Sequence, residues 1–296
     1  MITARNLTKH YENSPALDEV SFSFPDAGIF GIIGHNGAGK TTLLKMIAGL
    51  IAPTSGELDV NGIDVVHDPL ALKATLGYLP EESRLYETMT AEDYLAFFGD
   101  IYGIPKDEIT VRTRRLFAAL SLETEGKKLG EFSKGMKRKA AIARSLIHDP
   151  AFLVYDEPTS GLDPMTSRFI AEYLKKLKTG GKTIVLSAHN LFQVEAICDR
   201  VMILRRGKVI ASGTMKELRG QFGSITYTVW FSAPDPARID RHEVPFREDE
   251  GYLACDAPDM ATLNAISSAI TAAGGRVERI ESRYPSLEEM LVAIGK

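Results

Sequence analysis

Short apolar runs alternate with longer amphipathic stretches along most of the chain. The apolar runs have the length of strands buried on both faces, and the amphipathic stretches repeat apolar residues at helical spacing. Continuous apolar strands separated by helices are typical of a mostly parallel sheet covered on both faces. The predicted strands are residues 16–24, 28–33, 151–155, 182–186 and 201–204, and the predicted helices are residues 40–50, 91–102, 106–120, 133–148 and 164–179. The pattern therefore predicts an α/β fold.

The alternation breaks after Pro80. From there to about Gly130 the pattern is almost purely helical, which indicates helices inserted between two strands of the sheet. We therefore predict an inserted α-helical subdomain at about residues 80–150.

The last quarter of the chain has a different pattern. A boundary is predicted near residues 220–223, and residues 224–231 then alternate between two sets of side chains, as in a half-buried strand. A turn with Pro234 and Pro236 follows, and the remaining elements are a weak strand near 252–255, a helix at 260–273, a strand at 276–282 and a helix at 286–294. We predict a first domain over residues 1–220 and a small C-terminal α+β appendage over residues 221–296.

Composition excludes several classes of protein. Of the 296 residues, 44% are hydrophobic and 25% are charged, which suits a globular protein, and the net charge of −4 gives no positive field for nucleic acid. The N-terminus lacks a secretory signal, and no run approaches the roughly 18 apolar residues of a membrane span. Cys198 and Cys255 lack a metal-like spacing, so we expect two reduced thiols in a cytoplasmic protein. Any work at a membrane then requires a partner.

A glycine-rich segment carries the strongest chemical signal. Residues 34–41, Gly-His-Asn-Gly-Ala-Gly-Lys-Thr, fit the pattern G-x-x-x-x-G-K-[ST] between a predicted strand and a predicted helix. Such a loop curls so that its N–H groups meet phosphate oxygens beside a helix N-terminus, and its lysine neutralises phosphate charge. The alternative, a glycine-rich turn that happens to precede a helix, is disfavoured by the strand–loop–helix context. The predicted phosphate ligands are Gly34, His35, Asn36, Gly37, Ala38, Gly39, Lys40, Thr41 and Thr42, with the Thr41 hydroxyl also a Mg²⁺ ligand.

Two carboxylates complete the predicted site. Residues 151–155 form an apolar run that ends in Asp156 and Glu157, and ligands of open α/β sheets bind at the carboxyl ends of strands. We predict that Asp156 holds Mg²⁺ through its water shell and that Glu157 is the general base for an attacking water. A strand that ends in Asp-Glu is a weak signal alone, and the phosphate loop strengthens it.

Several further motifs together resemble the nucleotide-binding subunit of an ATP-binding-cassette (ABC) transporter, which has a P-loop NTPase core. Residues 158–163, Pro-Thr-Ser-Gly-Leu-Asp, resemble the D-loop of that family, and His189 in Ser187-Ala188-His189 resembles its switch histidine. Tyr11 lies where the family places an aromatic ring against adenine. The resemblance implies that Tyr11 and Asp163 contact ATP and that His189 assists Glu157 in catalysis.

Two motifs depart from the family pattern. Residues 132–136, Phe-Ser-Lys-Gly-Met, resemble the signature Leu-Ser-Gly-Gly-Gln, and the resemblance implies that Ser133 and Gly135 contact nucleotide held by the opposite subunit. Ser133 also suits an N-cap, and the two roles are compatible. Glu81 stands where the family usually has glutamine, and it can bind Mg²⁺ or its water. Both variants resemble the ABC-2 type exporter branch.

The resemblance implies an ATPase that drives export through a transmembrane permease on the inner face of the cell membrane. It also implies a head-to-tail dimer, either of two copies or with a second ABC ATPase. One alternative is an ABC ATPase that acts on nucleic acid or ribosomes, and another is a binding module with an inactive site. The first would use two basic clusters, Arg112/Arg114/Arg115 and Lys134/Lys137/Arg138/Lys139, which we interpret as solvated helix faces. We expect no nucleic-acid partner.

Overall fold

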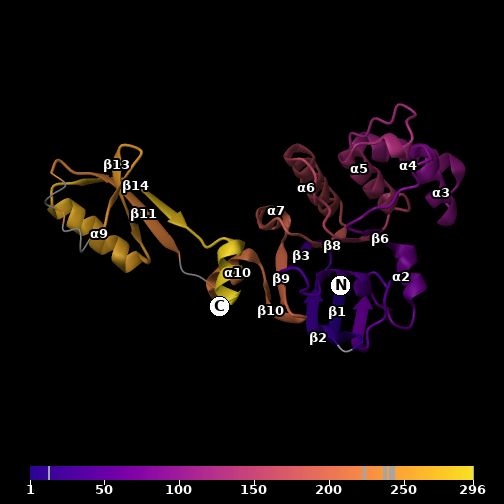
Figure 1. Ribbon diagram of the computed structural model, residues 1–296, viewed down its shortest axis with the longest axis horizontal. Helices are drawn as coiled ribbons and strands as arrows, with labels where there is room; N and C mark the ends of the chain where they lie inside the picture. Colours follow the sequence, from indigo (N-terminus) through magenta and orange to yellow (C-terminus); the bar gives the residue numbers. More distant parts are fainter. Residues whose placement is uncertain (13, 223–224, 236–238, 240–243, 296) are drawn as a thin grey trace. The chain divides into compact units, whose positions relative to one another are not determined.

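A computed structural model describes residues 1–12, 14–222, 225–235, 239 and 244–295. The chain divides into two compact units, Met1–Met215 and Lys216–Lys296 (Figure 1). Gly223 of the predicted boundary, Ser224 of the predicted strand and Pro236 of the predicted turn lie outside the described residues.

A six-stranded sheet forms the centre of the first unit. Its order is β10-β9-β3-β8-β7-β6, and every neighbouring pair is parallel except β9 with the edge strand β10. All residues of β3, β7 and β8 are buried, which explains their continuous apolar sequences. The strands are β3 (Ile29–Ile33), β6 (Leu76–Leu79), β7 (Phe152–Tyr155), β8 (Thr183–Ser187), β9 (Arg200–Arg205) and β10 (Lys208–Gly213). The predicted mostly parallel sheet is confirmed.

A second, antiparallel sheet has the order β2-β1-β4-β5. Its strands are β1 (Ile2–Tyr11), β2 (Ser14–Phe24), β4 (Ser55–Val60) and β5 (Ile63–Asp64). Residues 16–24 were predicted as a strand of the mostly parallel sheet, and that placement is wrong, because only one side of β2 is buried. That side packs on the main core, where the rings of Phe24 in β2 and Phe30 in β3 stack with centroids 4.6 Å apart.

The predicted helical insert is present, and its helices lie together on one side of the first unit (Figure 1). Side chains cap the starts of several of these helices, among them Thr90 at α3, Ser133 at α5 and Asp163 at α6. The helices are α1 (Lys40–Ile47), α2 (Pro69–Thr75), α3 (Ala91–Ile101), α4 (Lys106–Ala119), α5 (Lys134–Leu146), α6 (Pro164–Thr179) and α7 (Leu191–Ile197), with a 3₁₀ turn at Leu129–Glu131. Within the described parts of the chain, no helix has the length and hydropathy of a membrane span.

A half-buried histidine follows α5. The ring of His148 stacks on Tyr102 with centroids 3.8 Å apart, and its Nε2 lies 3.2 Å from the Leu76 carbonyl oxygen. Because a carbonyl oxygen only accepts, Nε2 carries the proton and Nδ1 is the unprotonated nitrogen. Nδ1 is buried and has no hydrogen-bond partner among the described residues, so a second proton there would also lack an acceptor. Burial accordingly lowers the pKa of His148 to about 4.

Acid should therefore destabilise the protein through His148. Its folded pKa of about 4 lies below the ordinary value of 6.5, so the unfolded chain binds more protons between these pH values. The free energy of unfolding should fall by about 3 kcal/mol from this residue as the pH drops through that window. Urea unfolding of wild type and His148→Gln between pH 7 and pH 4 measures the difference, and parallel pH dependences of the two proteins would contradict it.

The second unit contains a four-stranded antiparallel sheet of order β12-β13-β11-β14. Buried residues of the sheet, among them Val229 and Cys255, pack against Ile266 and Ile270 of the helix α9. On β11, Trp230 alternates with the core residues, and its Nε1–H donates to Asp249 (2.9 Å). The elements are α8 (Met215–Phe222), which begins at the division between the units, β11 (Thr226–Ser232), β12 (Arg247–Asp249), β13 (Tyr252–Ala257), α9 (Met260–Ala272), β14 (Arg276–Arg283) and α10 (Leu287–Gly295). The predicted α+β appendage is present.

Candidate nucleotide site

The loop between β3 and α1 is shaped by close backbone approach. Gly39 has φ of 104°, and an added Cβ there would lie 2.5 Å from the Ala16 carbonyl oxygen. A Cβ at Gly34 would collide with the Leu204 carbonyl oxygen. Both positions therefore require glycine. His35, Asn36 and Gly37 are exposed, and Thr41 and Thr42 are half-buried in the first turn of α1, so these residues are available to a ligand.

Lys40 brings a buried cation to this loop. Its side chain is 7% exposed, and its Nζ donates to the carbonyl oxygens of Gly34 (2.7 Å) and His35 (3.3 Å). Burial lowers the pKa of Lys40, and the carboxylates of Glu157, Asp156 and Glu81 act in the opposite direction. In the sheet, β8 alone separates β3 from β7, so the loops that follow β3 and β7 leave the same edge. The structure therefore brings together the phosphate loop and the carboxylates.

Ser187 holds the backbone and side chain at the end of β7. Its hydroxyl donates to Asp156 Oδ1 (2.5 Å), and it accepts from the Glu157 N–H (3.0 Å). Both carboxylate residues are buried. The motif Ser187-Ala188-His189 contains Ser187, but the sequence alone predicts no role for it. Its place at the carboxyl end of β8, beside the strand that ends in Asp156, is the signal that identifies it.

Glu157 and His189 form a pair. The His189 N–H donates to Glu157 Oε2 (3.0 Å), and His189 Nε2 lies 3.3 Å from Oε1. Oε1 is buried and, among the described residues, has no partner with hydrogen-bond geometry. Burial raises the pKa of Glu157, and His189 and Lys40 oppose that rise. The pair thus presents a carboxylate of raised pKa whose Oε1 has no hydrogen-bond partner among the described residues, which suits a general base that takes a proton from water.

The donor set suits a magnesium ion that keeps other ligands. Among the described residues, no cluster of three or more Asp, Glu, His or Cys residues has the geometry to hold a metal by itself. Asp156 and Thr41 provide a carboxylate and a hydroxyl beside the loop, and Glu81 is exposed nearby. Mg²⁺ usually binds one or two carboxylates together with water and substrate phosphates. These three residues therefore fit Mg²⁺ delivered with a nucleotide.

Four predicted ligands lie elsewhere in the first unit. Tyr11, at the end of β1, is 49% exposed, with the Lys9 ammonium 5.4 Å from its ring centroid. Ser133 and Gly135 begin α5, where the Ser133 hydroxyl accepts from the Met136 N–H (3.2 Å). Asp163 caps α6 by accepting from the Thr166 N–H (2.9 Å). Ser133, Gly135 and Asp163 thus belong to helix starts outside the loop that contains Lys40.

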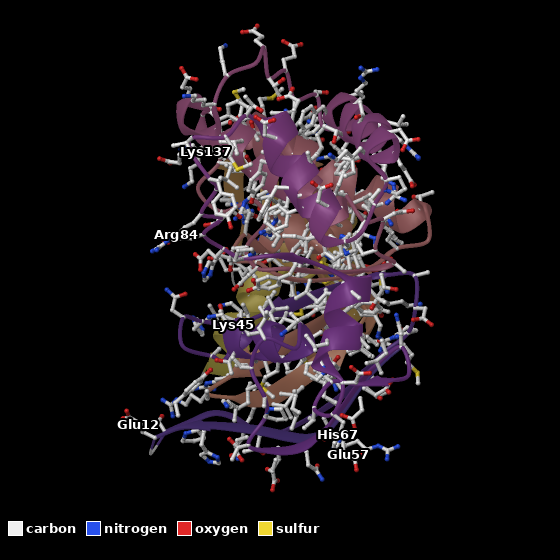
Figure 2. All side chains as sticks on the ribbon, turned by 90° about the vertical axis from the view of Figure 1, so that its right-hand side faces the viewer. Glu12, Lys45, Glu57, His67, Arg84 and Lys137 are labelled. Atoms are coloured by element: carbon white, nitrogen blue, oxygen red, sulfur yellow. The ribbon has the colours of Figure 1, made fainter. Side chains whose placement is uncertain are left out.

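The basic clusters are largely engaged within the molecule. Arg112 pairs with Glu108 (2.6 Å), and Lys137 pairs with Glu87 (2.9 Å; Lys137 is labelled in Figure 2). Lys139 donates to the Ser121 carbonyl oxygen (3.1 Å). Arg138 is 6% exposed and lies beside Glu157, so its assignment to a solvated helix face is wrong. These contacts leave a weaker basic surface than the sequence suggests.

Two family models match the chain. A model described as ABC transporter matches residues 17–160, and a model described as the C-terminal domain of DrrA1-3-like ATP-binding proteins matches residues 213–292. The ABC transporter ATP-binding protein NatA of Bacillus subtilis is 39% identical over 224 residues, which cover 74% of this chain and 91% of NatA. The uncharacterized ABC transporter ATP-binding protein MJ1023 of Methanocaldococcus jannaschii is 37% identical over 260 residues, covering 88% of this chain and 92% of that protein.

Solved structures resemble about three quarters of the chain. A structure described as the ATP-binding subunit of an ABC transporter is 34% identical, with a TM-score of 0.69, and covers 75% of this chain and 93% of its own. A dimeric structure of the ATP-binding cassette MJ0796 in a post-hydrolysis state, bound to ADP and Pi, is 26% identical, with a TM-score of 0.68. That match covers 73% of this chain and 99% of the other.

Proposed function

This chain belongs to the family of ABC transporter ATP-binding proteins, and from that membership we propose how its residues carry out ATP hydrolysis for transport. It is the ATP-binding and ATP-hydrolysing subunit of an ABC transporter of the exporter type. A role on nucleic acid or ribosomes is not favoured, because the relatives are transporter subunits. One observation carries the mechanism: Lys40 and the Glu157–His189 pair meet at one edge of the sheet.

Nucleotide binding rests on the loop of residues 34–42. Its N–H groups and the ammonium of Lys40 bind the phosphates, and the exposed ring of Tyr11 stacks on the adenine. Thr41, Asp156 and Glu81 would hold Mg²⁺ or its water ligands. When bound, Mg²⁺ supplies charge neutralisation for the phosphates.

Hydrolysis uses Glu157 as the general base. Its carboxylate takes a proton from a water whose oxygen forms a bond to the γ-phosphorus, and the bond from that phosphorus to the β-phosphate oxygen breaks to give ADP and phosphate. The buried Oε1 is the acceptor for that proton. His189 orients the carboxylate through its N–H and steadies the γ-phosphate with its half-exposed ring.

We place the remaining ligands across a dimer. Ser133, Gly135 and Asp163 contact a nucleotide held by the loop of a second cassette, so that two sites form between head-to-tail protomers. The start of α5 suits this role, since its Ser133 and Gly135 amides lie at the positive end of a helix. ATP then closes the dimer because its charge needs donors from both sides, and hydrolysis lets the dimer open.

A negative charge at position 133 should abolish dimerisation and leave the protein folded. Aspartate caps helices as well as serine does, so Ser133→Asp should leave α5 intact while its carboxylate repels the γ-phosphate of the partner. In a Glu157→Gln background, light scattering with MgATP should detect a dimer that Ser133→Asp abolishes, with binding of ATP to the monomer retained. The matched control is Thr90→Asp, at the cap of α3, which should dimerise normally. An unchanged dimer in Ser133→Asp would contradict the head-to-tail arrangement.

The helical insert offers the surface for the permease. Aromatic residues around Tyr94 in α3 pack with one another. Two residues of α3, Phe97 (41%) and Ile101 (62%), and the following Tyr102 (37%) keep exposed apolar surface. We propose that this face receives the membrane subunit, while residues 221–296 form an accessory domain and residues 1–220 the ATPase domain.

Crosslinking tests that surface. Cys198 and Cys255 are buried, so a cysteine introduced at Ile101 should dominate labelling by a short bifunctional reagent. We expect Ile101→Cys to crosslink to a membrane protein that co-purifies with the chain. Ile280→Cys in the second unit, which is 48% exposed, is the control. Crosslinks from position 280 alone would instead indicate that the membrane protein docks on the accessory domain.

A further inference from the structure

Arg138 is a buried guanidinium with fixed partners. It lies in the second turn of α5 and is 6% exposed. Its Nη2 donates to the Glu157 carbonyl oxygen (2.7 Å), and its Nη1 donates to the Pro80 carbonyl oxygen (2.8 Å). One planar side chain therefore joins α5 to the end of β7 and to the segment that follows β6.

The residue that Arg138 holds has an unusual backbone. Glu157 has φ of 49°, which lies in the left-handed region that side chains other than glycine disfavour. Its N–H donates to Ser187 Oγ, and its carbonyl oxygen accepts from both Arg138 Nη2 and the Ser160 N–H (3.1 Å). The backbone of the general base is thus held from both sides. Since that backbone decides where Oε1 lies, its anchors also decide the position of the proton acceptor.

The positive charge of Arg138 also offsets the negative charge of nearby carboxylates. Burial lowers the pKa of its guanidinium, while the carboxylates of Glu81, Asp156 and Glu157 act in the opposite direction, with Glu81 the strongest. Lys40 interacts with the same three carboxylates from the phosphate loop. The site therefore contains two buried cations, of which Arg138 lies outside the loop that would bind phosphate.

Arg138 connects the start of α5 with the site that contains Glu157. Ser133, the cap of the same helix, lies one turn earlier, and Lys134 in between lies against Gly161, where a side chain on that glycine would collide with its ammonium. Under the proposed function, on which this step rests, the start of α5 meets ATP in the partner subunit. Movement of α5 would then reach Glu157 through Arg138.

We propose that Arg138 is a positioning residue for ATP hydrolysis. It fixes the backbone of Glu157 and the Pro80 segment to α5, so that the base is set for proton transfer only when α5 is in its place at the dimer interface. A buried arginine that merely supports the fold would change stability and leave the pH dependence and the rate of turnover by the folded protein unaltered.

The test compares Arg138→Gln, Arg138→Lys and the control Lys137→Gln in steady-state hydrolysis of MgATP. Lys137 lies one residue earlier and pairs with Glu87, so its variant removes the same charge without touching Glu157. For Arg138→Gln we expect kcat to fall about 10- to 100-fold with KM for ATP within about threefold, because the phosphate loop is unchanged. Loss of the cation should also move the acid limb of the kcat profile up by about half a pH unit or more. Lys137→Gln should match wild type.

Arg138→Lys keeps the charge but loses the two-armed geometry. We expect it to lower kcat about tenfold and to leave the acid limb in place. If Arg138→Gln does not fold, as thermal unfolding would reveal, Arg138→Lys decides: wild-type kcat in that variant overturns the proposal. Wild-type kcat and acid limb in folded Arg138→Gln overturn it as well. Failure of wild type to hydrolyse MgATP, measured in the same assay, would instead overturn the proposed function.

Discussion

Replacement of Glu157 by glutamine should lower ATP turnover at saturating MgATP by about a thousandfold. General-base catalysis contributes roughly 10²- to 10⁴-fold, and the amide of glutamine cannot accept the proton of the attacking water. Binding should persist, because residues 34–42 and Lys40 are untouched. The uncleaved ATP should then hold two cassettes together, so the variant should run as a dimer with MgATP and as a monomer without it.

The kcat of Glu157→Gln therefore reports on general-base catalysis, and its light scattering reports on dimerisation. Glu82→Gln is the matched control, since it makes the same change of carboxylate to amide at an exposed position in the neighbouring segment. Turnover of Glu157→Gln within a few fold of wild type would exclude Glu157 as the base. Because burial raises the pKa of Glu157, the acid limb of wild-type turnover should also lie above the ordinary glutamate value of 4.5.

Replacement of Lys40 by methionine should weaken ATP binding by roughly 100-fold or more. Hydrogen bonds to a charged group contribute about 1.5 to 3 kcal/mol each, and loss of the buried ammonium removes at least one such bond to phosphate. It also leaves Asp156 and Glu157 without the cation that the loop brings to them. Isothermal titration with MgATP measures the change.

Lys45 supplies the control for this substitution. It lies in the last turn of α1, away from the loop, and Figure 2 labels it on the face of the molecule shown there. Lys45→Met removes the same charge from the same helix and should bind ATP as wild type does. Equal affinities of Lys40→Met and wild type would contradict the phosphate site itself.

Strands buried on both faces were predictable from the sequence, whereas β1 and β4 of the antiparallel sheet were not. Each residue of β3 and β7 is buried, so their apolar runs stand out. Buried and exposed residues do not alternate regularly along β1, because its pairing register with β2 shifts between Ala4 and Leu7, where Asn6 has φ of 48°. β4 buries only two of its six residues. The antiparallel sheet therefore carries a weak pattern.

The candidate site, too, was only partly predictable from the sequence. The phosphate loop and the carboxylates at the end of β7 follow from motifs, but Arg138 was placed among surface charges. A signal for its burial existed, because Arg138, Ala141, Ile142 and Ser145 share one helical stripe, and the other three members are buried. A charge on an apolar stripe indicates an internal partner. Identification of that partner as the Glu157 carbonyl oxygen required the tertiary structure.

The tight backbone of the loop between β3 and α1 has a consequence for nucleotide selectivity. Under the proposed function, main-chain groups and one lysine recognise the charge and spacing of a polyphosphate tail, which adenosine and guanosine triphosphates share. The side chains of His35 and Asn36 are exposed. Under the same proposal Tyr11 is the contact for the nucleobase, and because a flat aromatic ring stacks on any purine, we expect the protein to discriminate between phosphate tails more strongly than between adenine and guanine.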